Sequence, residues 1–104
     1  MLVCRAPGYS IYSSAKAAVE AITIALAREL GPSGVRVNAV APGTTKTDMT
    51  RRVLTAELEA MTVNRTALRR IGCPDDIAKV VSFLASDDAA WITGEVITAS
   101  GGLR

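Results

Sequence analysis

Two short runs of β-branched residues constrain this chain most, because each follows a long segment of helical character. The first run covers residues 35–40 and the second covers residues 95–99. Strands that are separated by helical segments pair in parallel and form an α/β layered fold. A parallel sheet is normally buried on both faces and wider than two strands. The pattern therefore predicts an α/β fold to which these 104 residues contribute only part of a sheet.

Residues 11–30 are the clearest predicted helix. They contain no Gly or Pro, and Gly31 and Pro32 follow as a stop signal. Their many alanines allow a sheet to approach closely on one side and a second element on the other. We expect such a helix to be covered on more than one side.

Two further helices are predicted downstream. A weaker one runs from residues 47–48 to about Met61, and residues 62–72 after it are predicted to be loop. The next begins at Pro74, where the acidic first turn suits the helix dipole, and stops in residues 86–88. Two strands and about three helices are therefore expected.

Composition excludes several kinds of site. The chain has no histidine, which excludes histidine-based triads and most catalytic zinc sites, so no metal site is expected. Twelve basic and ten acidic residues give a net charge of +2, which does not favour nucleic acid or an anionic membrane as a partner. The basic pairs at residues 51–52 and 69–70 are predicted to lie on solvated faces.

The cysteines favour a reduced, cytoplasmic chain. Cys4 and Cys73 lie far apart without a CxxC spacing, although a disulfide between them stays open. Charged residues interrupt every apolar stretch before it reaches the length of a membrane span. The first eight residues do not show the pattern of a secretory signal.

Tyr12 and Lys16 form the pair with most chemical promise. Four residues apart on a helix, their side chains emerge on the same face. A phenol is a weak acid, and an ammonium one turn away stabilises the phenolate, which suits a general acid/base. In the alternative, Tyr12 packs at the helix start while Lys16 pairs with Glu20, and spacing alone favours this structural role.

Three segments, in this order, change that balance: YSIYSSAKAAVEAITIALAREL, GVRVNAVAPGTTKTDM and GCPDDIAKVVSFLASDDAAWITGEVITASGG. Together they resemble the C-terminal part of the short-chain dehydrogenase/reductase family across residues 8–102. The resemblance implies a Rossmann-type, doubly wound parallel sheet whose last two strands are the two β-branched runs. It also implies an oxidoreductase that transfers hydride between NAD or NADP and a carbonyl or secondary alcohol.

By this resemblance, Tyr12 is the catalytic general acid/base toward the substrate. Lys16 assists Tyr12 and binds the ribose hydroxyls of the nicotinamide cofactor. An epimerase or dehydratase that uses the same pair is a further alternative.

The resemblance also places a cofactor-binding turn after the first strand. Pro42 and Gly43 match the family's PG segment beside the nicotinamide. A backbone group at Thr45 and the side chain of Thr47 are the implied cofactor contacts. Equally open is a structural role for both threonines, as turn residues and as the N-cap of the next helix.

Other residues near this turn receive weaker predictions. Asn38 is predicted to be a buried amide that ties the strand to a turn rather than a ligand. Five apolar residues occupy the place of the family's substrate-covering segment and suggest a partly nonpolar substrate: Met49, Val53, Leu54, Leu58 and Met61.

Parts of the family pattern are absent from these 104 residues. There is no Gly-rich strand-to-helix turn for the cofactor diphosphate. The family's serine, about a dozen residues before the tyrosine, would precede Met1. We therefore expect residues 1–104 to be the C-terminal half of one domain, inactive alone, from a protein that is homo-oligomeric and acts on a small molecule. The alternative is a truncated remnant that works as an association module.

Overall fold

The computed structural model describes residues 7–103. Its elements follow the order α1 (Ser10–Leu30), η1 (Gly31–Ser33), β1 (Ala39–Pro42), α2 (Asp48–Arg51), α3 (Ala56–Arg65), α4 (Pro74–Ala85), η2 (Asp87–Ala89) and β2 (Val96–Ala99). Helix α1 and helix α4 match the first and last predicted helices closely. Cys4 lies outside the described residues, so the structure tests neither its predicted free thiol nor the alternative disulfide with Cys73.

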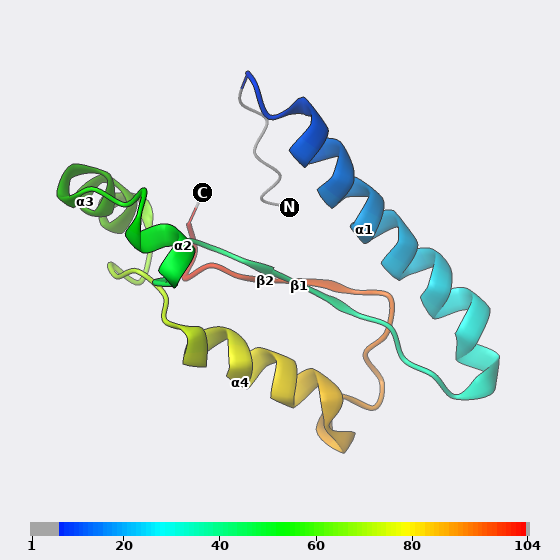
Figure 1. The fold of residues 1–104 in the computed structure, drawn as a ribbon. Helices are drawn as coiled ribbons and strands as arrows, with labels where there is room; N and C mark the ends of the chain where they lie inside the picture. The colour runs from blue at the N-terminus through cyan, green and yellow to red at the C-terminus, as the bar shows by residue number, and fades with distance from the viewer. Residues whose placement is uncertain (1–6, 104) are drawn as a thin grey trace.

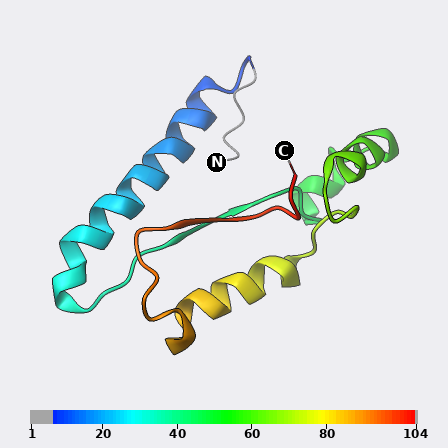
Figure 2. The ribbon, with the colours of Figure 1, turned by 180° about the vertical axis from the view of Figure 1, so that it is seen from behind.

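The two strands form a parallel sheet, as predicted. Their register runs from Ala39 opposite Val96 to Pro42 opposite Ala99. Helix α1 lies on one side of the strands and α4 on the other, while α2 and α3 lie beyond the carboxyl ends (Figure 1). The view from behind shows the same two layers around the strands (Figure 2).

Helix α1 touches the rest of the chain along a narrow line. Only Thr23 and Ala27 are buried on it. At Ala27 the contact is close, because a Cβ on Gly94 would lie 3.3 Å from the Ala27 Cβ. The helix therefore leaves a row of large apolar side chains exposed: Ile11, Tyr12, Val19, Ile22, Ile24 and Leu30.

The described core is small for a chain of this size. Its buried apolar residues are Ala27, Ile71, Leu84 and Ala89. The accessible surface is 7655 Å², whereas a compact protein of this mass exposes about 5,600 Å². The radius of gyration is 15.4 Å, compared with about 13 Å for a compact domain of this length. The chain thus exposes surface that a closed domain would bury.

The prediction of a single helix from residues 47–48 to Met61 is wrong. Two helices, α2 and α3, replace it, and α3 continues to Arg65 into the segment predicted as loop. The break arises because Thr55 is a second N-cap, whose hydroxyl accepts a hydrogen bond from the Leu58 amide at 3.2 Å.

The first strand begins later than predicted, at Ala39 instead of residue 35. Before it, the Val37 amide donates to the Thr93 hydroxyl at 3.0 Å rather than to a strand. Asn38 then fixes the start of the ladder. Its Nδ2 donates to the Ile92 carbonyl at 2.9 Å, and its Oδ1 accepts from the Glu95 amide at 3.1 Å. The predicted structural role of this half-buried amide is confirmed.

Candidate functional site

Tyr12 and Lys16 lie together near the N-terminal end of α1. The Lys16 Nζ is 5.4 Å from the centroid of the Tyr12 ring, close enough for a cation–π attraction. The Tyr9 ring packs edge-on against the Tyr12 ring, with centroids 6.2 Å apart. Tyr12 remains about half exposed. This arrangement orients the phenol while leaving it accessible to a substrate.

The surface pair between Lys16 and Glu20, which belonged to the alternative interpretation, does not form. Both residues line the same cavity, yet the ion pairs among the described residues join other side chains. The Lys16 ammonium therefore faces a phenol ring rather than a carboxylate.

A cavity of about 150 Å³ connects the tyrosine–lysine pair to β1. Tyr12, Lys16 and Val19 form its α1 side, and β1 from Ala39 to Pro42 forms the opposite side. The structure thus brings three of the predicted site residues together, namely Tyr12, Lys16 and Pro42, at the carboxyl end of a strand. In open α/β sheets, ligands bind beyond the carboxyl ends of the strands.

Gly43 fastens the end of β1 to the end of β2. Its amide donates to the Ala99 carbonyl at 2.9 Å. A Cβ on Gly43 would lie 2.7 Å from both the Cα and the Cβ of Ser100. The glycine is therefore required by this close approach, and the turn that follows has a fixed starting point.

Thr45 lies buried in the turn that follows Gly43. Its hydroxyl donates to the Gly43 carbonyl at 3.0 Å. Its backbone N–H has no acceptor among residues 7–103. The turn therefore holds one backbone donor that the described part of the chain does not use.

Thr47 caps α2. Its hydroxyl accepts a hydrogen bond from the Thr50 amide at 3.3 Å, and the Thr50 hydroxyl accepts one from the Thr47 amide at 2.7 Å. This is a reciprocal capping box. The structural alternative that the sequence left open for Thr47 is thus present, and its contact with a cofactor stays a prediction.

The two threonines do not share the cavity of Tyr12 and Lys16. Thr45 and Thr47 line a groove against α4, together with Ile77 and Val81. Pro42 borders both the cavity and this groove. The predicted site residues therefore lie on the two sides of the end of β1, and Pro42 joins them.

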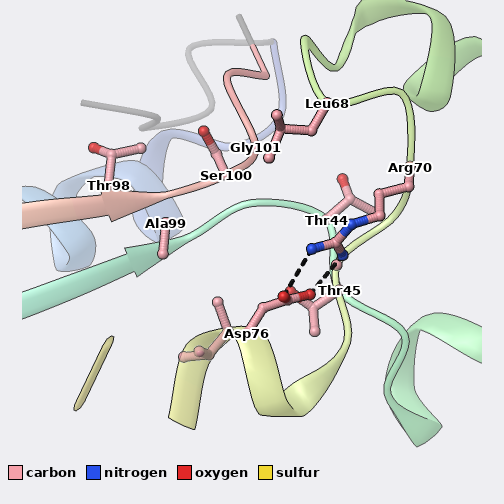
Figure 3. Close-up of a pocket in the computed structure, with 11 residues that line it drawn as sticks. Thr44, Thr45, Leu68, Arg70, Asp76, Thr98, Ala99, Ser100 and Gly101 are labelled. Carbon is pink, nitrogen blue, oxygen red and sulfur yellow. Dashed lines mark hydrogen bonds and ion pairs between the residues drawn. The ribbon is translucent and has the colours of Figure 1, made fainter. Parts of the chain in front are cut away.

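Sequence reasoning missed a polar network beside the turn, in which Arg70 is the central cation. Arg70 is exposed, as predicted, and its guanidinium also forms two hydrogen bonds with the Asp76 carboxylate, at 2.6 and 2.8 Å. Figure 3 shows this pair beside Thr44 and Thr45. It lines a cavity of about 200 Å³ at the carboxyl ends of both strands. The acidic residue at the third position of α4 was the available signal, since such a residue completes a capping box.

The same network shifts the ionisation of Asp76. The Arg70 guanidinium, and then the Cys73 amide and thiol, donate hydrogen bonds that hold the pKa of the Asp76 carboxyl well below its usual range. In return, the pKa of Arg70 is raised. Cys73 is an exposed free thiol.

Two kinds of feature are not found in the described part of the chain. Within residues 7–103, no group of three or more His, Cys, Asp or Glu side chains is arranged to hold a metal ion. No helix in the same range has both the length and the apolar character needed to cross a membrane.

Known proteins match nearly the whole chain. The family model described as Enoyl-(Acyl carrier protein) reductase matches residues 3–104. An uncharacterized oxidoreductase of Methylorubrum extorquens is 53% identical over 100 residues, which are 94% of this chain and 40% of that protein. The 3-oxoacyl-[acyl-carrier-protein] reductase of Pseudomonas aeruginosa is 49% identical over 96 residues, which are 92% of this chain and 38% of that protein.

A solved structure also matches nearly the whole chain. A short-chain type dehydrogenase/reductase from Mycobacterium ulcerans superposes with a TM-score of 0.89 and 37% sequence identity, over 95% of this chain and 36% of that one. The predicted α/β fold class is thereby confirmed. The chain spans 36–40% of the length of these three proteins.

Proposed function

Because this chain belongs to the short-chain dehydrogenase/reductase family and shares part of its Rossmann-type fold, we propose that the protein carrying it is an NAD(P)-dependent oxidoreductase. It interconverts a carbonyl and a secondary alcohol on a small molecule. A bound nicotinamide supplies or accepts the hydride in such a reaction.

The cavity shared by Tyr12, Lys16 and Pro42 is the observation that carries the proposal. Tyr12 is the general acid/base. In reduction its hydroxyl gives a proton to the substrate oxygen, and in oxidation its phenolate takes that proton back. Its partial exposure allows this contact with a substrate.

Lys16 has two roles in this proposal. Its ammonium, 5.4 Å from the centroid of the Tyr12 ring, stabilises the phenolate left after proton transfer. Since no ion pair with a described carboxylate occupies it, the ammonium is also available to the ribose hydroxyls of the cofactor.

The turn after β1 fits the nicotinamide end of the cofactor. The Thr45 N–H, unused by the described residues, suits the carbonyl oxygen of a carboxamide. Pro42 and Gly43 position this donor at the carboxyl end of the strand. Thr47 adds a hydroxyl that is already the α2 N-cap.

The remainder of the cofactor requires residues beyond these 104. No Gly-rich turn at a helix N-terminus is present in the sequence to bind the diphosphate. We therefore propose that this chain is the C-terminal portion of one domain, in keeping with the 36–40% of the relatives' length that it spans.

Exposed apolar residues support a partly nonpolar substrate. Helices α2 and α3 lie beyond the carboxyl ends of the strands (Figure 1). Four of their residues or neighbours are exposed there: Met49, Val53, Leu58 and Met61. We also propose a cytoplasmic setting, which the two widely separated cysteines without a CxxC spacing favour.

A second candidate function is association. The chain exposes about 2,000 Å² more than a compact protein of its mass, which is more than twice the roughly 800 Å² that each partner buries in a standard interface between proteins. Homo-oligomerisation of the complete enzyme would cover part of it. In a truncated remnant, the same surface would act as an association module.

Oxidation of reduced nicotinamide by the full-length protein tests the proposed activity. With NADH and NADPH offered in turn against a panel of ketones and aldehydes, we expect carbonyl-dependent loss of absorbance at the reduced-nicotinamide band. Saturable cofactor binding without turnover would point to another substrate class. The absence of binding by either nicotinamide would contradict the proposal and favour the association module.

A further inference from the structure

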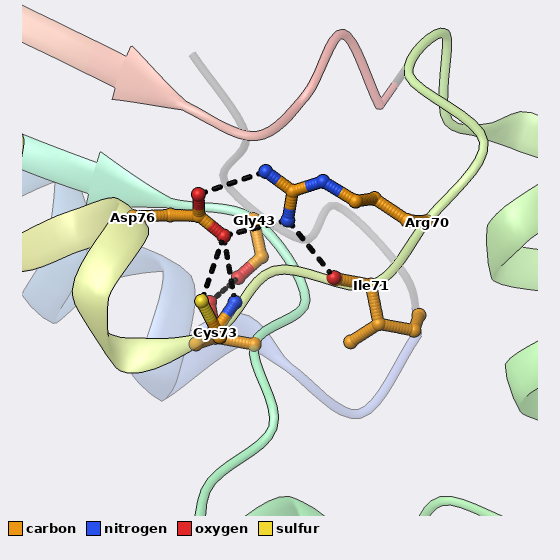
Figure 4. A network of polar contacts seen from close by, with 6 residues as sticks. Gly43, Arg70, Ile71, Cys73 and Asp76 are labelled. Carbon is orange, nitrogen blue, oxygen red and sulfur yellow. Dashed lines mark hydrogen bonds and ion pairs between the residues drawn. The ribbon is translucent and has the colours of Figure 1, made fainter.

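The segment before α4 is closed into a rigid loop by Arg70 and Asp76. Besides the two hydrogen bonds from Arg70, the Asp76 carboxylate accepts one from the Cys73 amide at 2.8 Å and one from the Cys73 thiol at 3.2 Å. Arg70 also donates to the Ile71 carbonyl at 3.3 Å. Figure 4 shows the bonds from Arg70 and Cys73 converging on the Asp76 carboxylate at the start of α4. We call residues 70–76 the clamp.

The clamp holds Gly72 against the turn that follows β1. The Gly72 amide donates to the Thr44 carbonyl at 3.0 Å, and the Gly72 carbonyl accepts from the Lys46 amide at 2.9 Å. Together they form an isolated parallel bridge between Thr45 and Gly72. The approach is tight, because a Cβ on Gly72 would lie 3.3 Å from both the Thr44 carbonyl oxygen and the Thr45 hydroxyl oxygen.

This bridge decides where the Thr45 amide is directed. In extended backbone, neighbouring N–H groups alternate in direction. The bonds at Thr44 and Lys46 therefore turn the Thr45 N–H away from Gly72, where it stays without a described acceptor. The donor assigned to the cofactor is thus oriented by a contact that the cofactor does not touch.

We propose that Arg70 and Asp76 are positioning residues: through Gly72 they fix the turn at residues 44–47 and so set the affinity for the nicotinamide end of the cofactor. The cofactor part of this inference rests on the proposed function. The mechanical part, which states that the clamp fixes the turn, does not rest on the proposed function.

The exposure of the pair indicates a local effect. The Arg70 and Asp76 side chains are 53% and 34% exposed, and partly exposed ion pairs contribute little to global stability. The pair acts here through its geometry, since two parallel hydrogen bonds from a guanidinium fix the orientation of the carboxylate that accepts them. We therefore expect loss of the pair to loosen the turn more than the sheet.

Arg70→Gln and Asp76→Asn in the full-length protein test both parts, with Arg51→Gln as the control. Arg51 also faces an acidic residue, Asp48, but at 3.7 Å and in an exposed position. The first readout is hydrogen–deuterium exchange at single amides. We expect the Lys46 and Gly72 amides to exchange faster in the two clamp variants by about 2- to 30-fold.

The ladder provides internal reference amides. Ala39 and Gly43 donate to the Glu95 and Ala99 carbonyls at 2.9 Å, and their exchange should not change. Equal acceleration at the Lys46 and Gly43 amides would mean that the ion pair is merely structural, and this would overturn the proposal. Unchanged exchange at Lys46 and Gly72 in both variants would overturn it as well.

The second readout is cofactor affinity. Fluorescence titration with reduced nicotinamide should give a Kd that is raised by about 2- to 30-fold in the clamp variants, with kcat at saturating cofactor preserved. Unchanged Kd values would overturn the cofactor part. A wild-type protein that bound no nicotinamide would overturn the proposed function itself, while the exchange data would still decide the mechanical part.

Gly72→Ala provides an independent probe that leaves the ion pair intact. The added methyl presses on Thr44 and Thr45, and cofactor affinity should fall. Gly31→Ala is the matched control, because a Cβ there meets nothing within 4 Å. Equal affinities in the two alanine variants would contradict control of the turn by Gly72.

Discussion

Gly43 and Ser100 are in such close contact that a Cβ on Gly43 would lie 2.7 Å from the Ser100 Cα. Gly43 is not among the glycines with positive φ, so the contact, rather than backbone conformation, demands glycine. The contact joins the residues that directly follow the two strands. It therefore sets the starting point of the turn that carries the proposed cofactor donor at Thr45.

Gly43→Ala should separate the ends of β1 and β2. The methyl has no space beside Ser100, and overpacking of this kind costs about 1–3 kcal/mol. Urea denaturation should show a lower free energy of unfolding than in the wild type. Gly31→Ala, in open space, is the control, and an equal stability of both variants would argue against the close contact.

Asn38→Ala should destabilise the protein by about 1–3 kcal/mol, because it removes the donor to Ile92 and the acceptor from Glu95. The exposed Asn64 on α3 gives a control substitution, Asn64→Ala. Thermal or urea unfolding measures the difference. Equal losses in the two variants would show that the bridge from Asn38 is not specific.

Helices α1 and α4 and the start of β1 show which parts of the fold the sequence predicts and which it does not. Helices α1 and α4 are encoded locally, by uninterrupted helix formers and by Gly31 or Pro74 at their borders. The sequence predicts the structural role of Asn38, as a polar amide within the β-branched run of residues 35–40. It does not predict the start of β1, because Asn38 sets it by bonding to residues more than fifty positions away.

The candidate site likewise has one part that the sequence predicts and another that depends on packing. Tyr12 and Lys16 share a helix face, so their proximity follows from spacing alone. The position of Pro42 beside them depends on how α1 packs on β1. The bonds between Arg70 and Asp76 depend on the fold of the loop between them, which no local periodicity specifies. The sequence pattern predicts one helix over residues 47–61 and therefore does not indicate Thr55 as a second N-cap.

The lowered pKa of Asp76 makes one contribution to stability dependent on pH. A carboxyl whose pKa is lower in the folded state favours folding above its ordinary pKa of about 4 and loses this effect as pH falls toward the folded value. The stability difference between wild type and Asp76→Asn should therefore be largest above about pH 4 and shrink in more acidic solution. Urea midpoints measured between neutral pH and pH 3 test this. The exposed neighbour provides the control Asp75→Asn, which should show a smaller pH-dependent difference.

Lys16→Gln in the full-length protein should impair both roles assigned to the ammonium. We expect kcat to fall about 100-fold, because the phenolate loses its electrostatic partner, and the KM for the nicotinamide to rise. Steady-state kinetics at several cofactor concentrations separate the two effects. Lys79→Gln, at an exposed lysine of α4, should leave both constants near their wild-type values, and a matching loss there would contradict the assignment.

Comparison of Tyr12→Phe with Tyr9→Phe in the full-length protein tests proton transfer by Tyr12 most directly. The two rings are in contact, with centroids 6.2 Å apart, and are similarly exposed, so the substitutions differ mainly in which hydroxyl is removed. Tyr12→Phe should lower kcat by about 10²- to 10⁴-fold with cofactor affinity retained, whereas Tyr9→Phe should keep nearly full turnover. Wild-type turnover in Tyr12→Phe, measured by nicotinamide absorbance, would contradict the role of Tyr12 as the general acid/base.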